Sequence, residues 1–263
     1  MLVRPKKRLG QNFLIDRNIQ SKIIDACELN PCDIVLEIGA GRGELTCLLA
    51  NKVKSVYAFE IDSGLCEILN SGLKEYPNVK VINQDILKFN FKRAFSKIKN
   101  KIKIVGNIPY YITTPIIEFF LKYSDKIDVV FITVQKEFAQ RMIADCSLRQ
   151  YGSLSCFVQY YTSPRILFQI KKNCFYPAPK VDSSFLRLEI KEKLPKEKKK
   201  EKMLFRLIRA AFNQRRKTLR NSLKGVISQG RMQSFFNKYQ IDCNVRPEKL
   251  SLKDFENLIE IGS

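Results

Sequence analysis

Apolar positions along the chain fall into short runs separated by stretches with helical spacing. The runs are rich in Val, Ile and Phe and predict strands over residues 34–38, 55–59, 79–83, 102–106 and 128–134. Between them, the spacing predicts helices over residues 44–51, 64–75 and 114–123. This alternation is typical of an α/β fold with a parallel sheet. Such sheets bind ligands beyond the carboxyl ends of their strands, so site residues are expected there.

The pattern changes after Pro177. A strand is predicted over residues 184–190, and the charged run at residues 196–202 is typical of a solvated linker or the start of a helix. Residues 203–231 have helical spacing and contain eight basic residues and no acidic one. We therefore predict two domains, an α/β domain over residues 1–192 and a small, basic, helical domain over residues 193–263.

The chain is strongly basic. Lys and Arg number 47 against 26 Asp and Glu, which gives a formal net charge of +21. This excess is larger than solubility requires and indicates a polyanionic partner. Nucleic acid fits best, because side chains that neutralise phosphates release counterions. A membrane-surface protein would usually have a basic amphipathic anchor, and the sequence shows none. A lysine-rich proteome would explain the same excess without any partner.

The eight cysteines are scattered, and the chain contains no histidine. No two cysteines have the Cys-x-x-Cys spacing, so the pattern argues against a zinc site and we expect no metal. No apolar run is long enough for a membrane span or a secretory core, so we expect reduced thiols in a cytoplasmic protein. A catalytic cysteine is disfavoured because no histidine is available to activate it.

A glycine-rich turn follows the first predicted strand. Gly39, Gly41 and Gly43 would let a ligand approach the backbone at the start of a helix. Their spacing departs from the dinucleotide fingerprint and lacks the phosphate-binding lysine, which disfavours NAD and ATP. Glu60 and Asp85 end the next two strands, where carboxylates can accept hydrogen bonds from ribose hydroxyls and an adenine amine. Each acid alone would be a solvated loop residue, but together these residues predict a site for S-adenosyl-L-methionine.

The fourth predicted strand runs into the tetrapeptide Asn107-Ile108-Pro109-Tyr110 at the same edge of the sheet. By itself, this could be an ordinary Asn-x-Pro turn beside a buried tyrosine. Next to a methyl-donor site, it predicts chemistry on an adenine amine, whose lone pair is delocalised into the ring. The side-chain carbonyl of Asn107 and a following backbone carbonyl can accept the two amine hydrogens, while Tyr110 offers a face for the base. In-line attack would then depend on positioning rather than on a strong base.

Four further segments carry a family likeness. They are residues 9–14 (LGQNFL), 151–155 (YGSLS), 175–183 (FYPAPKVDS) and 213–219 (NQRRKTL). With them, nearly the whole chain resembles the bacterial small-subunit (16S) rRNA adenine N6-dimethyltransferases (KsgA/RsmA type). Ala40 stands where many members have proline and Ile108 where many have leucine, and both changes keep a small or apolar side chain. The resemblance implies a Rossmann-like class I methyltransferase domain with a small C-terminal helical domain.

The resemblance also implies an activity and residue roles. The family dimethylates two adjacent adenosines in the 3′-terminal hairpin of 16S rRNA, in the small subunit or its precursor, and acts in ribosome biogenesis. The target base would lie against Tyr110, beside Asn107 and Pro109. Phe175, which by itself would more often be a core residue, would supply the second aromatic face. The expected cofactor contacts, including Gly41 from the glycine turn, are Asn12, Leu14, Gly39, Gly41, Glu60, Asp85 and Asn107.

Two basic segments supply candidate RNA contacts. The N-terminal run could be a tail without a role or a phosphate clamp beside the pocket. The basic helical segment has no acidic residue, which favours an RNA-facing surface even though part of any helix faces solvent. The candidates are Arg4, Lys6, Lys7, Arg8, Arg215, Arg216, Lys217 and Arg220.

Three alternatives share parts of this pattern. Related enzymes that methylate adenine in large-subunit rRNA have the same pocket, although residues 151–152 and 213–219 favour the small-subunit group. A non-catalytic RNA-binding factor on the same fold would not need Asn107, Pro109 and Tyr110, which are all present. A DNA adenine methyltransferase would use the same chemistry on a flipped base. We expect the chain to act as a monomer.

Overall fold

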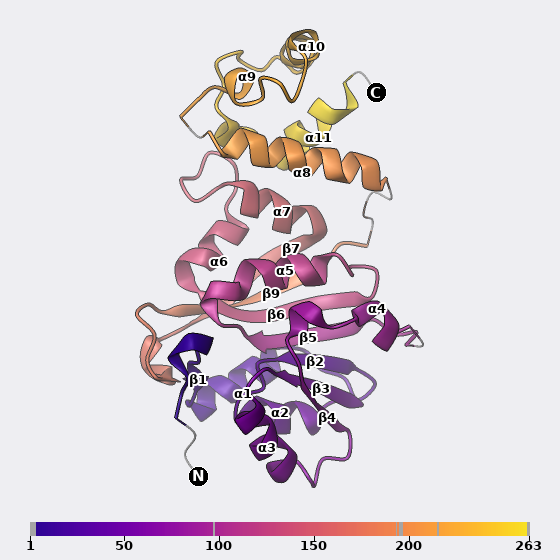
Figure 1. Ribbon diagram of the computed structural model, residues 1–263. Helices are drawn as coiled ribbons and strands as arrows, with labels where there is room; N and C mark the ends of the chain where they lie inside the picture. The colour runs from indigo at the N-terminus through magenta and orange to yellow at the C-terminus, as the bar shows by residue number, and fades with distance from the viewer. Residues whose placement is uncertain (1–3, 97, 193, 195–196, 215, 262–263) are drawn as a thin grey trace. The chain divides into compact units, whose positions relative to one another are not determined.

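The computed structural model describes residues 4–96, 98–192, 194, 197–214 and 216–261 (Figure 1). The chain forms two compact units. The first runs to Ala139 and also includes Arg165–Ile190, and the second is made of Gln140–Pro164 and the described residues from Lys191 onward. The second unit therefore takes in a segment between two strands of the first. The division into domains over residues 1–192 and 193–263 stays a prediction.

A seven-stranded sheet forms the centre of the first unit. Its strands are β2 (Ile34–Ile38), β3 (Ser55–Glu60), β4 (Val79–Asn83), β5 (Ile102–Asn107), β6 (Ile127–Gln135), β7 (Thr162–Ile170) and β9 (Ser183–Ile190). They lie in the order β4-β3-β2-β5-β6-β9-β7. The pairs from β4 to β6 are parallel, and β6 pairs with β9 antiparallel. The chain leaves β2 toward β3 on one side and returns to β5 on the other, which makes a topological switch point.

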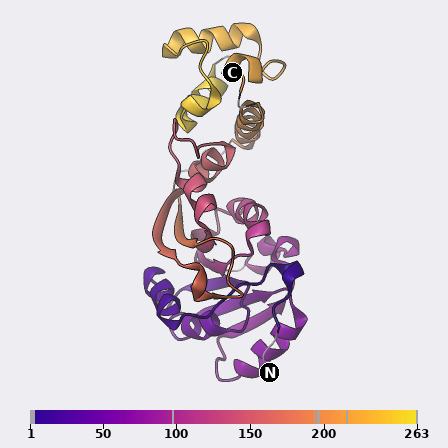
Figure 2. The same cartoon turned by 90° about the vertical axis from the view of Figure 1, so that its left-hand side faces the viewer.

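Helices cover both faces of this sheet, as Figure 2 shows from the side. They are α1 (Arg17–Ala26), α2 (Glu44–Ala50), α3 (Ser63–Gly72), α4 (Phe91–Ala94) and α5 (Thr113–Leu121). Helices α1–α3 pack against one face through a core that includes Ile23, Leu49 and Val56. Side chains alternate along a strand, so Phe59 points to the other face, where its ring contacts Phe89 at 4.7 Å between centroids.

The five strands predicted first are confirmed, each to within one residue at either end. Strand β2 is buried along its whole length, which explains why four of its five residues are apolar. The sequence pattern missed β7, which is interrupted by Pro164 and Arg165. This strand lies at the end of the sheet order, and proline is tolerated at an edge because one side of the strand has no partner.

The second unit is helical. Its helices are α7 (Ser153–Tyr161), α8 (Lys198–Phe212), α9 (Leu219–Ser222), α10 (Gln229–Tyr239) and α11 (Leu252–Glu260), and α6 (Lys136–Ile143) leads into it. The residues expected to be helical, 203–231, contribute to three separate helices, α8, α9 and α10. The Thr218 hydroxyl accepts from the N–H of Asn221 to start α9, and the Ser228 hydroxyl accepts from the N–H of Arg231 to start α10. These caps satisfy backbone donors at new helix starts and so divide the stretch.

Aromatic packing joins the parts of the second unit. The ring of Tyr151 lies 5.7 Å from that of Phe212 in α8, which in turn lies 5.9 Å from Phe255 in α11, between ring centroids. Tyr151 is buried, and the Cys156 thiol lies 3.0 Å from its hydroxyl. The segment 151–155 quoted for the family likeness is thus a packing element of this unit.

Short elements complete the fold. The two-residue strands β1 (Phe13–Leu14) and β8 (Phe175–Tyr176) form a separate antiparallel pair. The 3₁₀ turns are η1 (Lys7–Leu9), η2 (Ile86–Lys88), η3 (Tyr110–Ile112), η4 (Lys172–Cys174) and η5 (Pro247–Lys249).

Candidate active site

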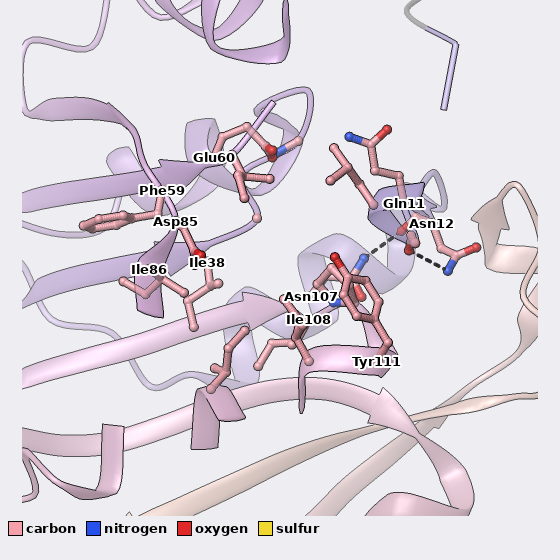
Figure 3. A pocket seen from close by; sticks show the side chains of 18 of the residues that line it. Gln11, Asn12, Ile38, Phe59, Glu60, Asp85, Ile86, Asn107, Ile108 and Tyr111 are labelled. Atoms are coloured by element: carbon pink, nitrogen blue, oxygen red, sulfur yellow. Dashed lines mark hydrogen bonds between the residues drawn. The ribbon is translucent and has the colours of Figure 1, made fainter. Parts of the chain in front are cut away.

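A pocket opens at the carboxyl ends of β2, β3, β4 and β5, next to the switch point of the sheet. It encloses about 850 Å³ of space including its open mouth. Figure 3 shows Phe59, Glu60 and Asp85 on one side and Gln11, Asn12 and Tyr111 on the other. The lining consists of residues 9–13, 38, 39, 41, 59–61, 84–86, 107–112 and 116.

The glycine turn approaches the two neighbouring strands closely. The N–H of Gly39 donates to the carbonyl of Phe59 at 2.9 Å, which ties the turn to the end of β3. Gly39 has a φ of +70°, and a Cβ at this position would lie 3.4 Å from the backbone oxygen of Asn107. Any larger side chain at Gly39 would be strained and would fill space next to Asn107. The turn thus keeps one wall of the pocket open.

The side chain of Glu60 is hydrogen-bonded to the same turn. One carboxylate oxygen accepts from the N–H of Gly41 at 3.0 Å, and the other accepts from the N–H of Asp62 at 2.9 Å. Burial raises the pKa of Glu60 above its ordinary value, and these backbone donors act in the opposite direction. A carboxylate oxygen has two lone pairs, so Glu60 keeps acceptor capacity for ribose hydroxyls.

Asp85 lies at the end of β4 and caps η2. Its Oδ1 atom accepts from the N–H of Leu87 at 3.0 Å. The other oxygen, Oδ2, has no hydrogen-bond partner among the residues that the structure describes. The side chain is half-buried in the pocket wall beside Ile86. One oxygen therefore fixes the side chain while the other is available to a donor on a ligand.

Asn107 is held by the N-terminal segment. Its side-chain N–H donates to the backbone carbonyl of Asn12 at 2.9 Å, and the Asn12 side chain donates to the carbonyl of Gly10 at 3.2 Å (Figure 3). Because the nitrogen of the Asn107 amide is engaged in this way, its carbonyl oxygen is left as the acceptor. This is the orientation that the predicted recognition of an amine requires.

Gly106 lets β5 approach β2 directly before Asn107. A Cβ at Gly106 would lie 3.1 Å from the Cβ of Ile38 and 3.2 Å from its carbonyl oxygen. Both contacts are closer than ordinary van der Waals separations, so a larger residue would require the strands to move apart by a few tenths of an ångström. The position of Asn107 therefore depends on the residue that precedes it.

Tyr110 begins η3, and its ring is anchored at the far end. The hydroxyl lies 2.6 Å from the hydroxyl of Ser183 in β9. Burial raises the pKa of Tyr110 above its ordinary value, so the side chain is neutral at physiological pH. Thr113 donates to the carbonyl of Tyr110 at 3.1 Å, and Pro109 precedes the turn. Tyr110 thus presents a fixed aromatic ring in the pocket lining.

Leu14 and Phe175 are not among the residues that line the pocket. They pair across β1 and β8 and are buried in the hydrophobic core of the first unit. Phe175 is 2% exposed, whereas its neighbour Tyr176 is 55% exposed. The expected cofactor contact from Leu14 and the expected base contact from Phe175 stay predictions.

The basic candidates differ in their surroundings. Lys6 makes an ion pair with Asp62, its Nζ lying 2.6 Å from Oδ1. Arg220 donates to Gln233 at 2.7 Å and lies over the ring of Phe236. Arg215 lies outside the described residues. The exposed candidates are Arg4, Lys7, Arg8, Arg216, Lys217 and Arg220.

Sequence reasoning missed the apolar and aromatic walls of the pocket. Ile61 and Ile86 directly follow Glu60 and Asp85, and Ile61 is 53% exposed although it is apolar. Tyr111 is 61% exposed, and its ring lies over Gly10, where a Cβ would come within 3.1 Å of it. The sequence did contain one indication of these residues, because each directly follows a predicted site residue.

The described residues contain neither a metal-binding cluster nor a membrane-spanning helix. No group of three or more Cys, Asp or Glu side chains in the described part of the chain is arranged to hold a metal ion. Among the helices that the structure describes, none combines the length and the apolar composition needed to cross a membrane.

Comparisons with known proteins identify similar sequences and structures. The family model for ribosomal RNA adenine dimethylase matches residues 3–262. The ribosomal RNA small subunit methyltransferase A of Clostridium botulinum (strain Loch Maree) is 42% identical over 253 residues, which cover 96% of this chain and 92% of that protein. 

Two solved structures share the fold over most of their length. A dimethyladenosine transferase from Plasmodium falciparum has a TM-score of 0.78 and 27% identity, covering 94% of this chain and 95% of that one. The 23S rRNA methyltransferase ErmE has a TM-score of 0.72 and 26% identity, covering 95% of this chain and 100% of that one. The expected Rossmann-like class I methyltransferase fold is confirmed. From the family match and the identity over nearly its full length, the chain belongs to the ribosomal RNA adenine dimethylase family.

Proposed function

We propose that the chain uses S-adenosyl-L-methionine to dimethylate the N6 amines of two adjacent adenosines in the 3′-terminal hairpin of 16S rRNA. It would act in the cytoplasm, on the small subunit or its precursor, and as a monomer. The observation that carries this proposal is the orientation of Asn107. Its amide nitrogen is engaged by Asn12, so its carbonyl oxygen is the acceptor in a pocket that the glycine turn also lines.

The residues present fit the cofactor. Gly39 leaves an open wall, Glu60 and Asp85 offer carboxylate oxygens at neighbouring strand ends, and Ile61 and Ile86 offer an apolar slot for a purine ring. When bound, S-adenosyl-L-methionine supplies a methyl group whose bond to sulfur breaks as the bond to nitrogen forms. Glu60 would hold the ribose and Asp85 the adenine amine of the cofactor.

The chain's own residues prepare the target amine. The oxygen of Asn107 and a backbone carbonyl of the segment after it accept the two amine hydrogens and favour a pyramidal nitrogen with a localised lone pair. Because the amine becomes acidic as it is methylated, its proton can pass to water. The absence of histidine from the sequence is compatible with this route. Catalysis then rests on positioning and electrostatics.

Tyr110 would stack on the target base once it has left its own stack in the RNA. The hydrogen bond between Tyr110 and Ser183 fixes the ring before the base arrives, which lowers the entropic cost of binding. The exposed Lys and Arg side chains would contact phosphates and supply affinity that depends on salt.

The relatives support the small-subunit substrate. The Clostridium botulinum protein, named a small subunit methyltransferase, is 42% identical over nearly the whole chain, whereas ErmE, named a 23S rRNA methyltransferase, is 26% identical. The large-subunit alternative shares the fold, so an experiment has to separate the two.

Purified subunits from a strain without the endogenous modification provide the test. Each subunit is incubated with the protein and methyl-labelled cofactor, and the rRNA nucleosides are identified by mass spectrometry. We expect dimethyladenosine in 16S rRNA only, at two adjacent positions, and none with Asn107→Ala. Label confined to 23S rRNA, or methylation of a nucleoside other than adenosine, would refute the proposal.

A further inference from the structure

The N-terminal segment from Lys6 to Phe13 forms one wall of the pocket and is attached to it at two points. At one end, the carbonyl of Asn12 accepts from the Asn107 side chain at 2.9 Å. At the other, the Lys6 ammonium contacts Asp62 at 2.6 Å. Residues 9–13 of this segment all line the pocket. The position of the wall is therefore determined by two contacts on different strand ends.

Asp62 is a buried acceptor with several donors. Its side chain accepts from Lys6, from the Gln11 amide at 3.2 Å and from the N–H of Gly64 at 3.1 Å, where it caps α3. Although burial by itself raises the pKa of Asp62, the hydrogen bonds from Lys6 and Gln11 outweigh it and hold the pKa below its ordinary value. A charged carboxylate that is 3% exposed requires such partners.

Hydrogen bonds also connect Asp62 to Glu60, which lines the pocket. The N–H of Asp62 donates to Glu60 at 2.9 Å, and the N–H of Lys6 donates to the Gln11 side chain at 2.7 Å. Lys6, Gln11, Asp62 and Glu60 thus form one continuous hydrogen-bonded network from the N-terminal wall to the predicted ribose site. A shift of Lys6 would be transmitted to the wall and to Glu60 together.

Lys6 differs in this respect from the two basic residues that follow it. Lys7 and Arg8 lie in η1 and are exposed, and neither has an ion pair with any residue that the structure describes. Both are free to meet a phosphate. The Lys6 ammonium, by contrast, is already paired with a buried carboxylate.

We propose that Lys6 is a positioning residue for the cofactor and not an RNA contact, and that its ion pair with Asp62 holds the Lys6–Phe13 segment closed over bound S-adenosyl-L-methionine. This deepens the proposed function and rests on it. Each methyl transfer consumes one cofactor molecule, so repeated transfer to the same hairpin requires repeated exchange. The strength of the ion pair then sets the cofactor's residence time, while Lys7 and Arg8 face the RNA.

Three variants separate this role from a phosphate contact. Lys6→Met removes the charge and keeps the apolar stem, Lys6→Arg keeps the charge, and Lys7→Met is a matched control in the same turn. For each, the affinity and dissociation rate of S-adenosyl-L-methionine are measured without RNA. Hydrogen exchange of the amides of residues 8–14 follows the segment directly, and RNA affinity is measured at several salt concentrations.

We expect Lys6→Met to weaken cofactor binding about tenfold, with faster dissociation and faster amide exchange, because a charge-assisted contact to a buried carboxylate is lost. Its RNA affinity and salt dependence should match those of the unmodified chain, and Lys6→Arg should restore cofactor binding. Lys7→Met should bind cofactor normally and lose RNA affinity with a shallower salt dependence.

Normal cofactor binding by Lys6→Met together with weaker RNA binding would overturn the proposal and make Lys6 a phosphate contact. Failure of the proposed function is distinguishable from this result. It would appear as an unmodified chain that binds the cofactor but does not dimethylate adenosine in 16S rRNA, whatever the Lys6 variants do.

Discussion

Gly106→Ala tests whether the close approach of β5 and β2 positions the Asn107 amide. The added methyl group would lie 3.1 Å from the Cβ of Ile38 and 3.2 Å from its carbonyl oxygen. Ile38 is buried and lies in a parallel strand paired with Gly106, so neither atom belongs to a flexible side chain that can move away. To relieve these two close contacts, the strands have to separate by a few tenths of an ångström. Overpacking of this kind costs about 1–3 kcal/mol.

The same shift reaches the active site, because Asn107 is the next residue and bonds to Asn12 at 2.9 Å. A misplacement of about 1 Å can cost on the order of 100-fold in rate, so a shift of a few tenths should lower the turnover number about tenfold. We expect the affinity for RNA to change little, since it depends on the exposed basic side chains.

Gly72→Ala is the matched control for Gly106→Ala. Gly72 is in the same unit, at the end of α3, and a Cβ there would meet no atom within 4 Å. It should be neutral or stabilise the chain by up to about 1 kcal/mol. The assay is urea denaturation of both variants, followed by single-turnover methylation of small subunits. If Gly106→Ala matches Gly72→Ala in stability and turnover, the two strands have room for a methyl group and the reasoning is wrong.

Three other predictions concern Asn107, Tyr110 and Glu37. Asn107→Ala should abolish methyl transfer in a radiolabel assay while RNA affinity stays within about twofold, since affinity comes from phosphate contacts; full activity would remove the proposed mechanism. Tyr110→Phe should lower stability by about 1 kcal/mol and retain most activity, because the ring remains and only the hydrogen bond to Ser183 is lost. Ser183→Ala should lower the free energy of unfolding by a similar amount, and the double variant should lose no more than either single variant. Denaturant titrations of the three variants measure this. Burial raises the pKa of Glu37 from 4.5 to about 7, although the hydrogen bond from Thr46 acts in the opposite direction. The protonated Glu37 side chain should therefore contribute fully to the free energy of unfolding below about pH 4.5. This contribution should decline as the pH rises to about 7. Glu37→Gln should remove this decline from the stability profile, and an unchanged profile would contradict the burial argument.

Much of the pocket could be predicted from the sequence because parallel strands place their carboxyl ends at one edge. Glu60, Asp85 and Asn107 each follow an apolar run, and the structure brings all three into one lining. The strands themselves were recognisable because both faces of β2 are buried and four of its five residues are apolar. Local sequence carried this information without any knowledge of long-range contacts.

Other features depend on partners that are distant in the chain. The basic run at the N-terminus predicted phosphate contacts, but one member, Lys6, pairs with a carboxylate 56 residues away. Phe175 has a sequence context typical of a substrate loop, yet pairing with Leu14 buries it in the core. Nothing in the neighbouring residues distinguishes these cases from exposed ones.

The sequence by itself determined the α/β fold of the chain, the edge of the sheet where ligands bind, and the residue types that could handle an adenine amine. These follow from periodicity and from spacing along single strands, which are local properties. Only the tertiary structure decided which atom of each side chain is available. The Asn107 oxygen is free because its nitrogen meets Asn12, and the Lys6 ammonium is engaged because it meets Asp62. Hydrogen bonds act over about 3 Å, so their partners are known only when the chain has folded.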